Sequence, residues 1–190
     1  MNWILASGSP RRRELLEMLG VPDLTIRPAK GPERATPGAG PEQTVRELSL
    51  HKAQEAAQTC APEDIIIAAD TIVYLDGAIL GKPRDHDDAV RMLTALSGRE
   101  HIVYTGVAVL RGGELRQAAE RRAVRFRPLT SGEIERYIAT GEPMDKAGAY
   151  GIQGRGALFV AHLDGDYFNV MGLPLCRLGQ LLNELGVELL

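Results

Sequence analysis

The sequence has few cysteines, no excess of positive charge and no long apolar run, and each deficit excludes a class of protein. Cys60 and Cys176 stand far apart without a Cys-x-x-Cys or histidine companion, which predicts reduced, packed thiols and no structural zinc. The formal net charge is -3, so a nucleic-acid polymer is a disfavoured partner. No segment has the length of a membrane span, and the first residues lack a signal-peptide pattern. We therefore expect a soluble cytoplasmic protein without a membrane partner.

Common catalytic signatures are also missing. The glycine-rich stretch from Gly148 to Gly156 matches neither a Walker A loop nor the Gly-x-Gly-x-x-Gly dinucleotide fingerprint, which excludes the common P-loop mechanism. Ser7 and Ser9 lack a nucleophile-elbow sequence, and the four histidines are dispersed, so no catalytic triad is recognisable.

What remains is a chain of 190 residues, 44% hydrophobic and 25% charged, which suits one globular domain or one domain folded as two lobes. Helices are expected over residues 10–19, 42–60, 85–96, 130–139 and 174–186, and strands over 3–6, 65–70, 72–75, 78–80, 102–110, 115–126 and on both sides of Asp164-Gly165. Because helices and hairpins are interleaved, an α/β fold with a mixed sheet and helices on its faces is favoured over a purely parallel one.

Three consecutive arginines, Arg11 to Arg13, stand where the first helix is expected to begin. Ser9 can cap this helix and Pro10 can occupy its first position. Cations are unfavourable at a helix N-terminus, whereas anions bind there readily. Either an anionic ligand lies in this turn, or the arginines point into water. The apolar positions expected to be buried are Leu15, Leu16, Met18 and Leu19.

Asp70 ends the apolar run that begins at Ile65, a pattern typical of a buried strand. Open α/β sheets place their sites at such strand ends, where a carboxylate can bind a metal or activate water. The alternative is an aspartate that caps the following turn. Several cations at element ends or beside glycines favour the functional interpretation, since one carboxylate among many cations is typical of phosphoryl chemistry. These cations are Arg11, Arg12, Lys52, Lys82 and Lys146.

Two other candidates lie in segments rich in glycine or proline. Gln153, within the glycine-rich stretch, carries an amide suited to the edge of a nucleobase. Glu33 lies in the stretch from Pro28 to Pro41, whose composition is typical of a mobile functional loop.

Segments along nearly the whole chain resemble motifs of the Maf family of nucleoside triphosphate pyrophosphatases. They are Leu5–Arg12, Ala68–Thr71, Gly81–Pro83, Tyr104–Gly106, Asp145–Gly154 and Asn169–Pro174. Asp145–Gly154 resembles the branch that hydrolyses dTTP and UTP rather than the branch that acts on 7-methyl-GTP. Ser49-Leu50-His51, before Lys52, departs mildly from the small apolar residues expected there.

The resemblance implies an elongated mixed-sheet α/β fold shared with the inosine triphosphate pyrophosphatases, with two lobes around a cleft. It implies a hydrolase that converts dTTP and UTP to the monophosphate and pyrophosphate, with a house-cleaning activity on modified pyrimidine nucleotides as an alternative specificity. It also implies dependence on Mg²⁺ or Mn²⁺, and a homodimer.

The same resemblance assigns roles to individual residues. Asp70 would be the proton acceptor, and Glu33 with Asp70 would hold the metal. The specificity positions would be Arg11, Thr71 and Gln153, and the phosphate-binding cations would be Arg12, Lys52 and Lys82. Two alternatives stay open: the 7-methyl-GTP activity of the same family, and a nucleotide-binding regulator of cell division or septum formation.

Overall fold

The computed structural model describes residues 1–32 and 34–190, which divide into two compact units. The first unit comprises Met1–Asp70, Thr105–Glu120 and Gly172–Leu190, and the second comprises Thr71–Tyr104 and Arg121–Met171. Three strands contribute residues to both units: β3 (Ile65–Leu75), β5 (Glu100–Arg111) and β6 (Glu114–Phe126).

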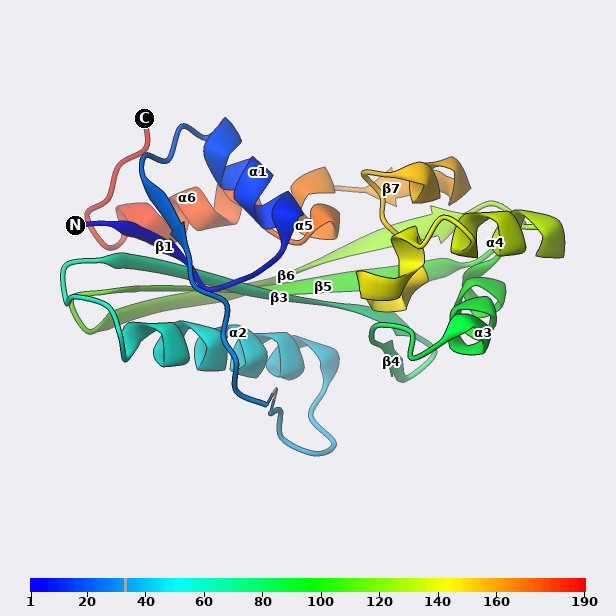
Figure 1. Cartoon of the computed structure of the whole chain (residues 1–190), viewed down its shortest axis with the longest axis horizontal. Coiled ribbons are helices and arrows are strands. Elements are labelled where there is room, and N and C mark those ends of the chain that lie inside the picture. The colour runs from blue at the N-terminus through cyan, green and yellow to red at the C-terminus, as the bar shows by residue number, and fades with distance from the viewer. Residues whose placement is uncertain (33) are drawn as a thin grey trace. The chain divides into compact units, whose positions relative to one another are not determined.

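The first unit is built on short parallel strands. Strand β1 (Trp3–Leu5) lies between β2 (Leu24–Ile26) and the start of β3, with Leu5 opposite Ile26 and Ile67. Helices α1 (Pro10–Met18) and α6 (Leu175–Asn183) cover one face of these strands, and α2 (Pro41–Ala57) covers the other (Figure 1). Burial on both faces explains why β1 and the start of β3 read as continuous apolar runs, whereas β2 is only partly buried.

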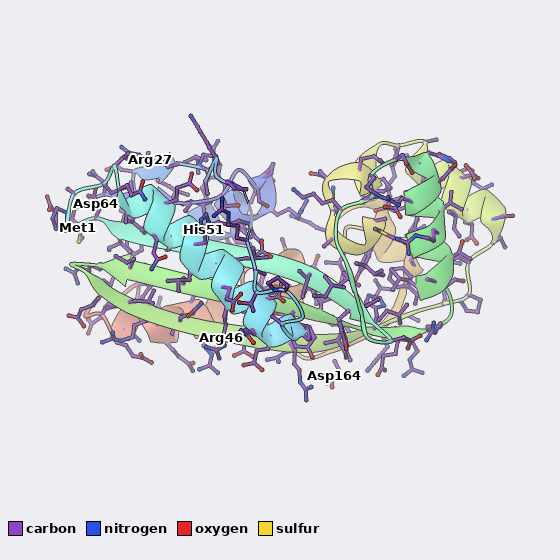
Figure 2. The ribbon with its side chains drawn as sticks, turned by 90° about the horizontal axis from the view of Figure 1, so that it is seen from below. Met1, Arg27, Arg46, His51, Asp64 and Asp164 are labelled. Atoms are coloured by element: carbon purple, nitrogen blue, oxygen red, sulfur yellow. The ribbon has the colours of Figure 1, made fainter. Side chains whose placement is uncertain are left out.

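Small side chains bring α2 close to the sheet. Ala53 and Ala56 of α2 pack with Ile4, Ile66 and Ala108 of the strands in one buried cluster. Helix α2 lies along the strands, with Arg46 toward its beginning and His51 near its middle (Figure 2). The packing of Ala53 and Ala56 therefore fixes how far this part of α2 lies from the strands.

The second unit combines hairpin ends with short helices. Strand β4 (Ala78–Leu80) pairs antiparallel with the end of β3, and β7 (Val160–Asp164) pairs antiparallel with β6. The remaining elements are α3 (His86–Leu96), α4 (Ser131–Ile138), the 3-10 turns η1 (Glu142–Asp145), η2 (Ala147–Ala149) and η3 (Arg155–Phe159), and α5 (Tyr167–Met171). Aromatic rings in edge-to-face contact form much of its core: His101, Phe126, Tyr137, Tyr150 and Phe159.

The strands of the described residues form one sheet in the order β2-β1-β3-β5-β6-β7, with β4 paired to β3 as the seventh strand. Parallel and antiparallel pairs both occur in it. The predicted mixed sheet flanked by helices is therefore confirmed.

The predicted positions of Ser9 and Pro10 are confirmed: Ser9 occupies the N-cap position of α1 and Pro10 lies in its first turn, although the Ser9 side chain makes no capping hydrogen bond within the described residues. Asp85 caps α3 by accepting a hydrogen bond from the Asp88 N–H, and Thr130 with Glu133 forms a capping box at the start of α4.

Two strand predictions are wrong. Strand β3 does not end at Asp70 but continues to Leu75, because β4 pairs with its second half. After the turn at Asp164-Gly165 the chain forms α5 instead of a strand, because the Asp166 carboxylate accepts a hydrogen bond from the Phe168 N–H (2.8 Å) and so stabilises a helical turn.

Two burial predictions are also wrong. Met18 is 59% exposed, because it lies outside the arc of about 100° that Leu15, Leu16 and Leu19 span on a helix. Cys176 is exposed on α6, while Cys60 is half-buried and packs against the core. Both thiols are free.

None of the helices described for residues 1–32 and 34–190 has the length and apolarity that a membrane crossing requires.

Candidate active site

Asp70 and Lys52 form an ion pair in the first unit. The Lys52 Nζ donates a hydrogen bond to Asp70 Oδ1. The Lys52 side chain is only 15% exposed and the Asp70 side chain only 11%, so water screens their attraction far less than at the surface. The pair therefore fixes a charged carboxylate in a largely dry environment.

The position of Asp70 follows from the parallel strands. Strand β1 ends at Leu5, opposite Ile67, and the Ala6 N–H still donates to Ile67 O (2.8 Å). Asp70 lies three residues further along β3. It therefore comes directly after the parallel part of the sheet, where open α/β folds carry their ligands, although β3 itself continues.

The arginine run has three different environments. The Arg12 Nε donates to Gly172 O (2.8 Å) and its Nη1 to Ser7 Oγ (3.0 Å), so Arg12 is anchored to the turn before α1 and to the chain before α6. Arg13 is solvated and pairs with the exposed Glu17 on the next turn (2.7 Å). Arg11 is half-buried at the start of α1.

Helix α2 is seated on β5 and β6 at the level of Val45 and Arg46. A Cβ on Gly106 of β5 would lie 2.5 Å from the Val45 carbonyl carbon and 3.0 Å from Arg46 N. The Gln117 side chain of β6 donates a hydrogen bond to Arg46 O. These contacts set the height of α2 over the strands and, with it, the position of Lys52.

Two glutamates of α2 hold the proline-rich loop that precedes it. Glu55 accepts from the Lys30 and Gly31 N–H groups (2.6 and 3.1 Å), and Glu47 accepts from the Thr36 N–H and hydroxyl (2.6 and 3.0 Å). These backbone hydrogen bonds lower the pKa of both carboxyls. Glu33, predicted in this loop as a metal ligand, lies outside the described residues.

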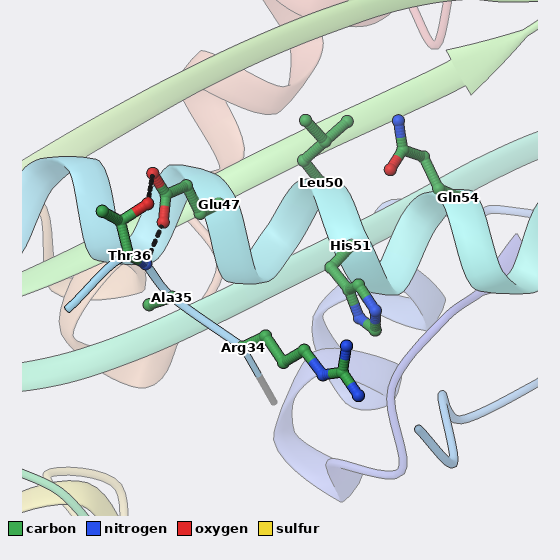
Figure 3. A pocket seen from close by; sticks show the side chains of 7 residues that line it. All are labelled: Arg34, Ala35, Thr36, Glu47, Leu50, His51 and Gln54. Atoms are coloured by element: carbon green, nitrogen blue, oxygen red, sulfur yellow. Dashed lines mark hydrogen bonds between the residues drawn. The ribbon is translucent and has the colours of Figure 1, made fainter. Parts of the chain in front are cut away.

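A pocket of about 380 Å³ opens where this loop meets α2 (Figure 3). Its lining residues are Arg34, Ala35, Thr36, Glu47, Leu50, His51 and Gln54. As far as the described residues go, this lining includes neither Asp70 nor Lys52, so the pocket and the predicted chemistry do not coincide.

The second unit brings together three of the predicted segments. Thr71 stands two residues before Val73 on β3, and a Cβ on Gly148 would lie 2.7 Å from a Val73 methyl group. The Gly148 N–H donates to Gly81 O (3.0 Å), which joins the glycine-rich stretch to the loop carrying the exposed Lys82. Glycine at 148 thus permits both contacts, and its φ of 68° is one that glycine favours.

Lys146, one of the candidate cations, is largely buried and hydrogen-bonded within its own segment. Its side chain is only 13% exposed, and its Nζ donates to Glu142 O (2.8 Å) and to Asp145 Oδ1 (2.6 Å). Gln153, by contrast, is exposed. Tyr137 and Glu142, which contact the stretch around Gln153, are not among the predicted site residues, because no sequence pattern marks these contacts.

No group of three or more His, Cys, Asp or Glu side chains suited to a metal ion occurs among the residues that the structure describes. Among the candidate residues of the first unit that the structure describes, Asp70 is the one that offers a buried carboxylate. Mg²⁺ commonly binds enzymes through one or two carboxylates together with substrate phosphates. A single carboxylate therefore fits a metal ion that arrives with a triphosphate.

Comparisons with known proteins identify the family of the chain. A family model described as Maf-like protein matches residues 2–185. The dTTP/UTP pyrophosphatase of Symbiobacterium thermophilum is 51% identical over 183 residues, covering 96% of this chain and 93% of that protein. The dTTP/UTP pyrophosphatase of Moorella thermoacetica is 51% identical over 187 residues, covering 97% and 95%.

A solved structure shares the fold at low identity. The HAM1 protein from Coxiella burnetii superimposes with a TM-score of 0.50 at 17% identity, covering 97% of this chain and 99% of that one. Since the family model and both relatives match nearly the whole length, the chain belongs to the Maf family.

Proposed function

We propose that this chain hydrolyses dTTP and UTP to the nucleoside monophosphate and pyrophosphate, with Asp70 as the general base. The observation that carries the proposal is the buried ion pair of Asp70 and Lys52, just beyond the parallel part of the sheet. Relatives at 51% identity that are named dTTP/UTP pyrophosphatases support the substrate assignment.

The ion pair suits a general base. A base must be ionised before it can accept a proton, and a cation at hydrogen-bond distance favours the ionised carboxylate. Lys52 therefore holds Asp70 charged and oriented. Burial restricts the water that can reach the carboxylate, so that one water can be positioned for attack.

The bond changes follow from attack at the α-phosphorus. Asp70 takes a proton from the water while the water oxygen bonds to the α-phosphorus. The bond from the α-phosphorus to the bridging oxygen breaks, and pyrophosphate leaves with that electron pair. Arg12 and Lys82 are proposed to bind the phosphates and to offset the charge that develops on them.

A divalent cation, Mg²⁺ or Mn²⁺, would when bound neutralise triphosphate charge and polarise the α-phosphoryl group. Asp70 is the residue proposed to hold it, together with Glu33. Arg11, Thr71 and Gln153 are the proposed specificity positions, with the Gln153 amide reading the edge of the base.

A panel of nucleoside triphosphates tests the proposal. The chain is incubated with each nucleotide and Mg²⁺ or Mn²⁺, and inorganic pyrophosphatase converts released pyrophosphate to phosphate for detection. We expect dTTP and UTP to give the highest kcat/KM. Preference for 7-methyl-GTP would assign the other branch of the family, and no hydrolysis of any nucleotide would favour a nucleotide-binding regulator.

A further inference from the structure

The segment from Gly151 to Gly156 is tied to two side chains of the second unit, Tyr137 of α4 and Glu142 of η1. The Gly151 N–H donates to the Tyr137 hydroxyl oxygen (3.0 Å), and that hydroxyl donates to Glu142 Oε1 (2.8 Å). The Arg155 and Gly156 N–H groups donate to Oε2 (3.0 Å) and Oε1 (3.2 Å) of Glu142. We call this arrangement the Tyr137–Glu142 clasp.

The glycines of the segment allow the clasp to close. A Cβ on Gly154 would lie 2.6 Å from Glu142 Cδ, and a Cβ on Gly156 would lie 2.8 Å from the Tyr137 hydroxyl oxygen. Neither distance is possible for a real side chain, so only glycine permits this approach. The spacing of these two glycines, which matches no phosphate-binding signature, is explained by the clasp.

The charge state of the clasp suits its hydrogen bonds. Burial would raise the pKa of the Glu142 carboxyl, but the hydrogen bonds from Arg155 N, the Tyr137 hydroxyl and Gly156 N outweigh burial and lower the pKa. Burial also raises the pKa of Tyr137, so its hydroxyl keeps the proton that it donates. At neutral pH, Glu142 is thus an acceptor for all three donors.

The clasp holds the chain on both sides of Gln153. Gly151 is bound two residues before it and Arg155 two residues after it, while Gln153 itself is exposed. A short segment fixed at both ends has few conformations left for the residue between them. The backbone position of Gln153, from which its amide projects, is therefore restrained by contacts that no nucleotide needs to touch.

We propose that Tyr137 and Glu142 are positioning residues for nucleobase selection, acting through the orientation of Gln153. This inference rests on the proposed function, in which Gln153 reads the base. It gives a role to the Tyr137 hydroxyl and the Glu142 carboxylate. Both lie close in the fold to the segment carrying Gln153, and neither is a proposed phosphate-binding residue.

The test compares UTP with CTP. Their bases differ at position 4, where uracil carries an acceptor oxygen and cytosine an amino donor, so an oriented amide can discriminate between them. The variants are Tyr137→Phe, which removes the hydroxyl with little change of shape, and Glu142→Gln, which puts an amide donor against backbone donors. The matched control is Thr130→Ala, which weakens the cap of the same helix α4 without touching the clasp.

We expect Tyr137→Phe and Glu142→Gln to lower the UTP:CTP ratio of kcat/KM by about five-fold, the effect of one net hydrogen bond. Adding Tyr137→Phe to Gln153→Ala should change the ratio no further, since the oriented group is already gone. Amide hydrogen exchange over residues 150–157, which needs no nucleotide, should accelerate in both clasp variants and stay unchanged in Thr130→Ala.

The outcomes separate the two proposals. A wild-type chain that hydrolyses neither UTP nor dTTP would overturn the proposed function. A UTP-selective wild type would leave that function standing, and the inference alone would fail in any of three cases: the clasp variants keep the wild-type ratio, Thr130→Ala loses it equally, or the effects of Tyr137→Phe and Gln153→Ala add.

Discussion

His101 is a buried imidazole whose surroundings make the second unit sensitive to acid. The residue is 2% exposed and packs edge-on against the rings of Phe126 and Tyr150. Its Nε2 is hydrogen-bonded to the Tyr150 hydroxyl (2.8 Å), and its Nδ1 has no hydrogen-bond partner among the residues described. Burial lowers the pKa of His101 to about 4, so this imidazole is neutral in the folded protein above that pH.

Stability should therefore fall as the pH drops from 6.5 toward 4. In that range the unfolded chain binds a proton at this position and the folded chain does not, which costs up to about 3 kcal/mol of unfolding free energy. Urea unfolding between pH 4.5 and 7.5 measures the slope. In His101→Gln, which cannot titrate, the slope should be smaller.

His86 is a control whose pKa is shifted in the opposite direction. Hydrogen bonds to the Asp87 and Glu135 carboxylates raise the pKa of this exposed histidine, so its contribution to stability is present at low pH and lost as pH rises through the raised pKa. His86→Gln should keep or steepen the acid loss. An identical slope in wild type and His101→Gln would contradict the account of His101.

At the scale of elements, α2 packs so closely on β5 that position 106 has no room for a side chain. Gly106→Ala should push α2 away from the strands, since its Cβ would overlap the Val45 carbonyl. We expect a loss of about 2 kcal/mol in unfolding free energy and a lower kcat, because Lys52 moves with α2. Thermal unfolding and steady-state kinetics measure the two effects.

Gly179→Ala is the matched control within the first unit. Gly179 lies inside α6, and a Cβ there would meet no atom of the described residues within 4 Å. This variant should gain up to about 1 kcal/mol, because alanine favours a helix more than glycine does. A Gly106→Ala variant as stable and active as wild type would show that α2 is not seated in this way.

Elements defined by local chemistry could be predicted, and elements defined by distant partners could not. The side-chain caps at Asp85 and Thr130 act within one helical turn, and Ser9 with Pro10 marks the start of α1, so local sequence is enough to indicate these helix starts. The extent of β3 depends on pairing with β4, and Asp70 therefore looked like a strand end. The start of α5 is a local signal that the strand prediction missed, since the Asp166 carboxylate accepts a hydrogen bond from the Phe168 N–H two residues later.

At the scale of the whole molecule, the candidate residues are distributed over both compact units. Arg11, Arg12, Lys52 and Asp70 belong to the first, and Thr71, Lys82 and Gln153 belong to the second. Motif resemblance predicted this set of residues but not their contacts. The pairing of Lys52 with Asp70 and the clasp of Tyr137 and Glu142 come from packing between elements, which no local pattern encodes.

The central claim is that water attacks the α-phosphorus with Asp70 as the base. Hydrolysis of UTP in H₂¹⁸O, followed by mass spectrometry of the products, tests it most directly. The account predicts UMP carrying one ¹⁸O, unlabelled pyrophosphate in equal amount, and no products from Asp70→Asn although that variant still binds UTP. Label in pyrophosphate, formation of UDP and phosphate, or normal turnover by Asp70→Asn would contradict it.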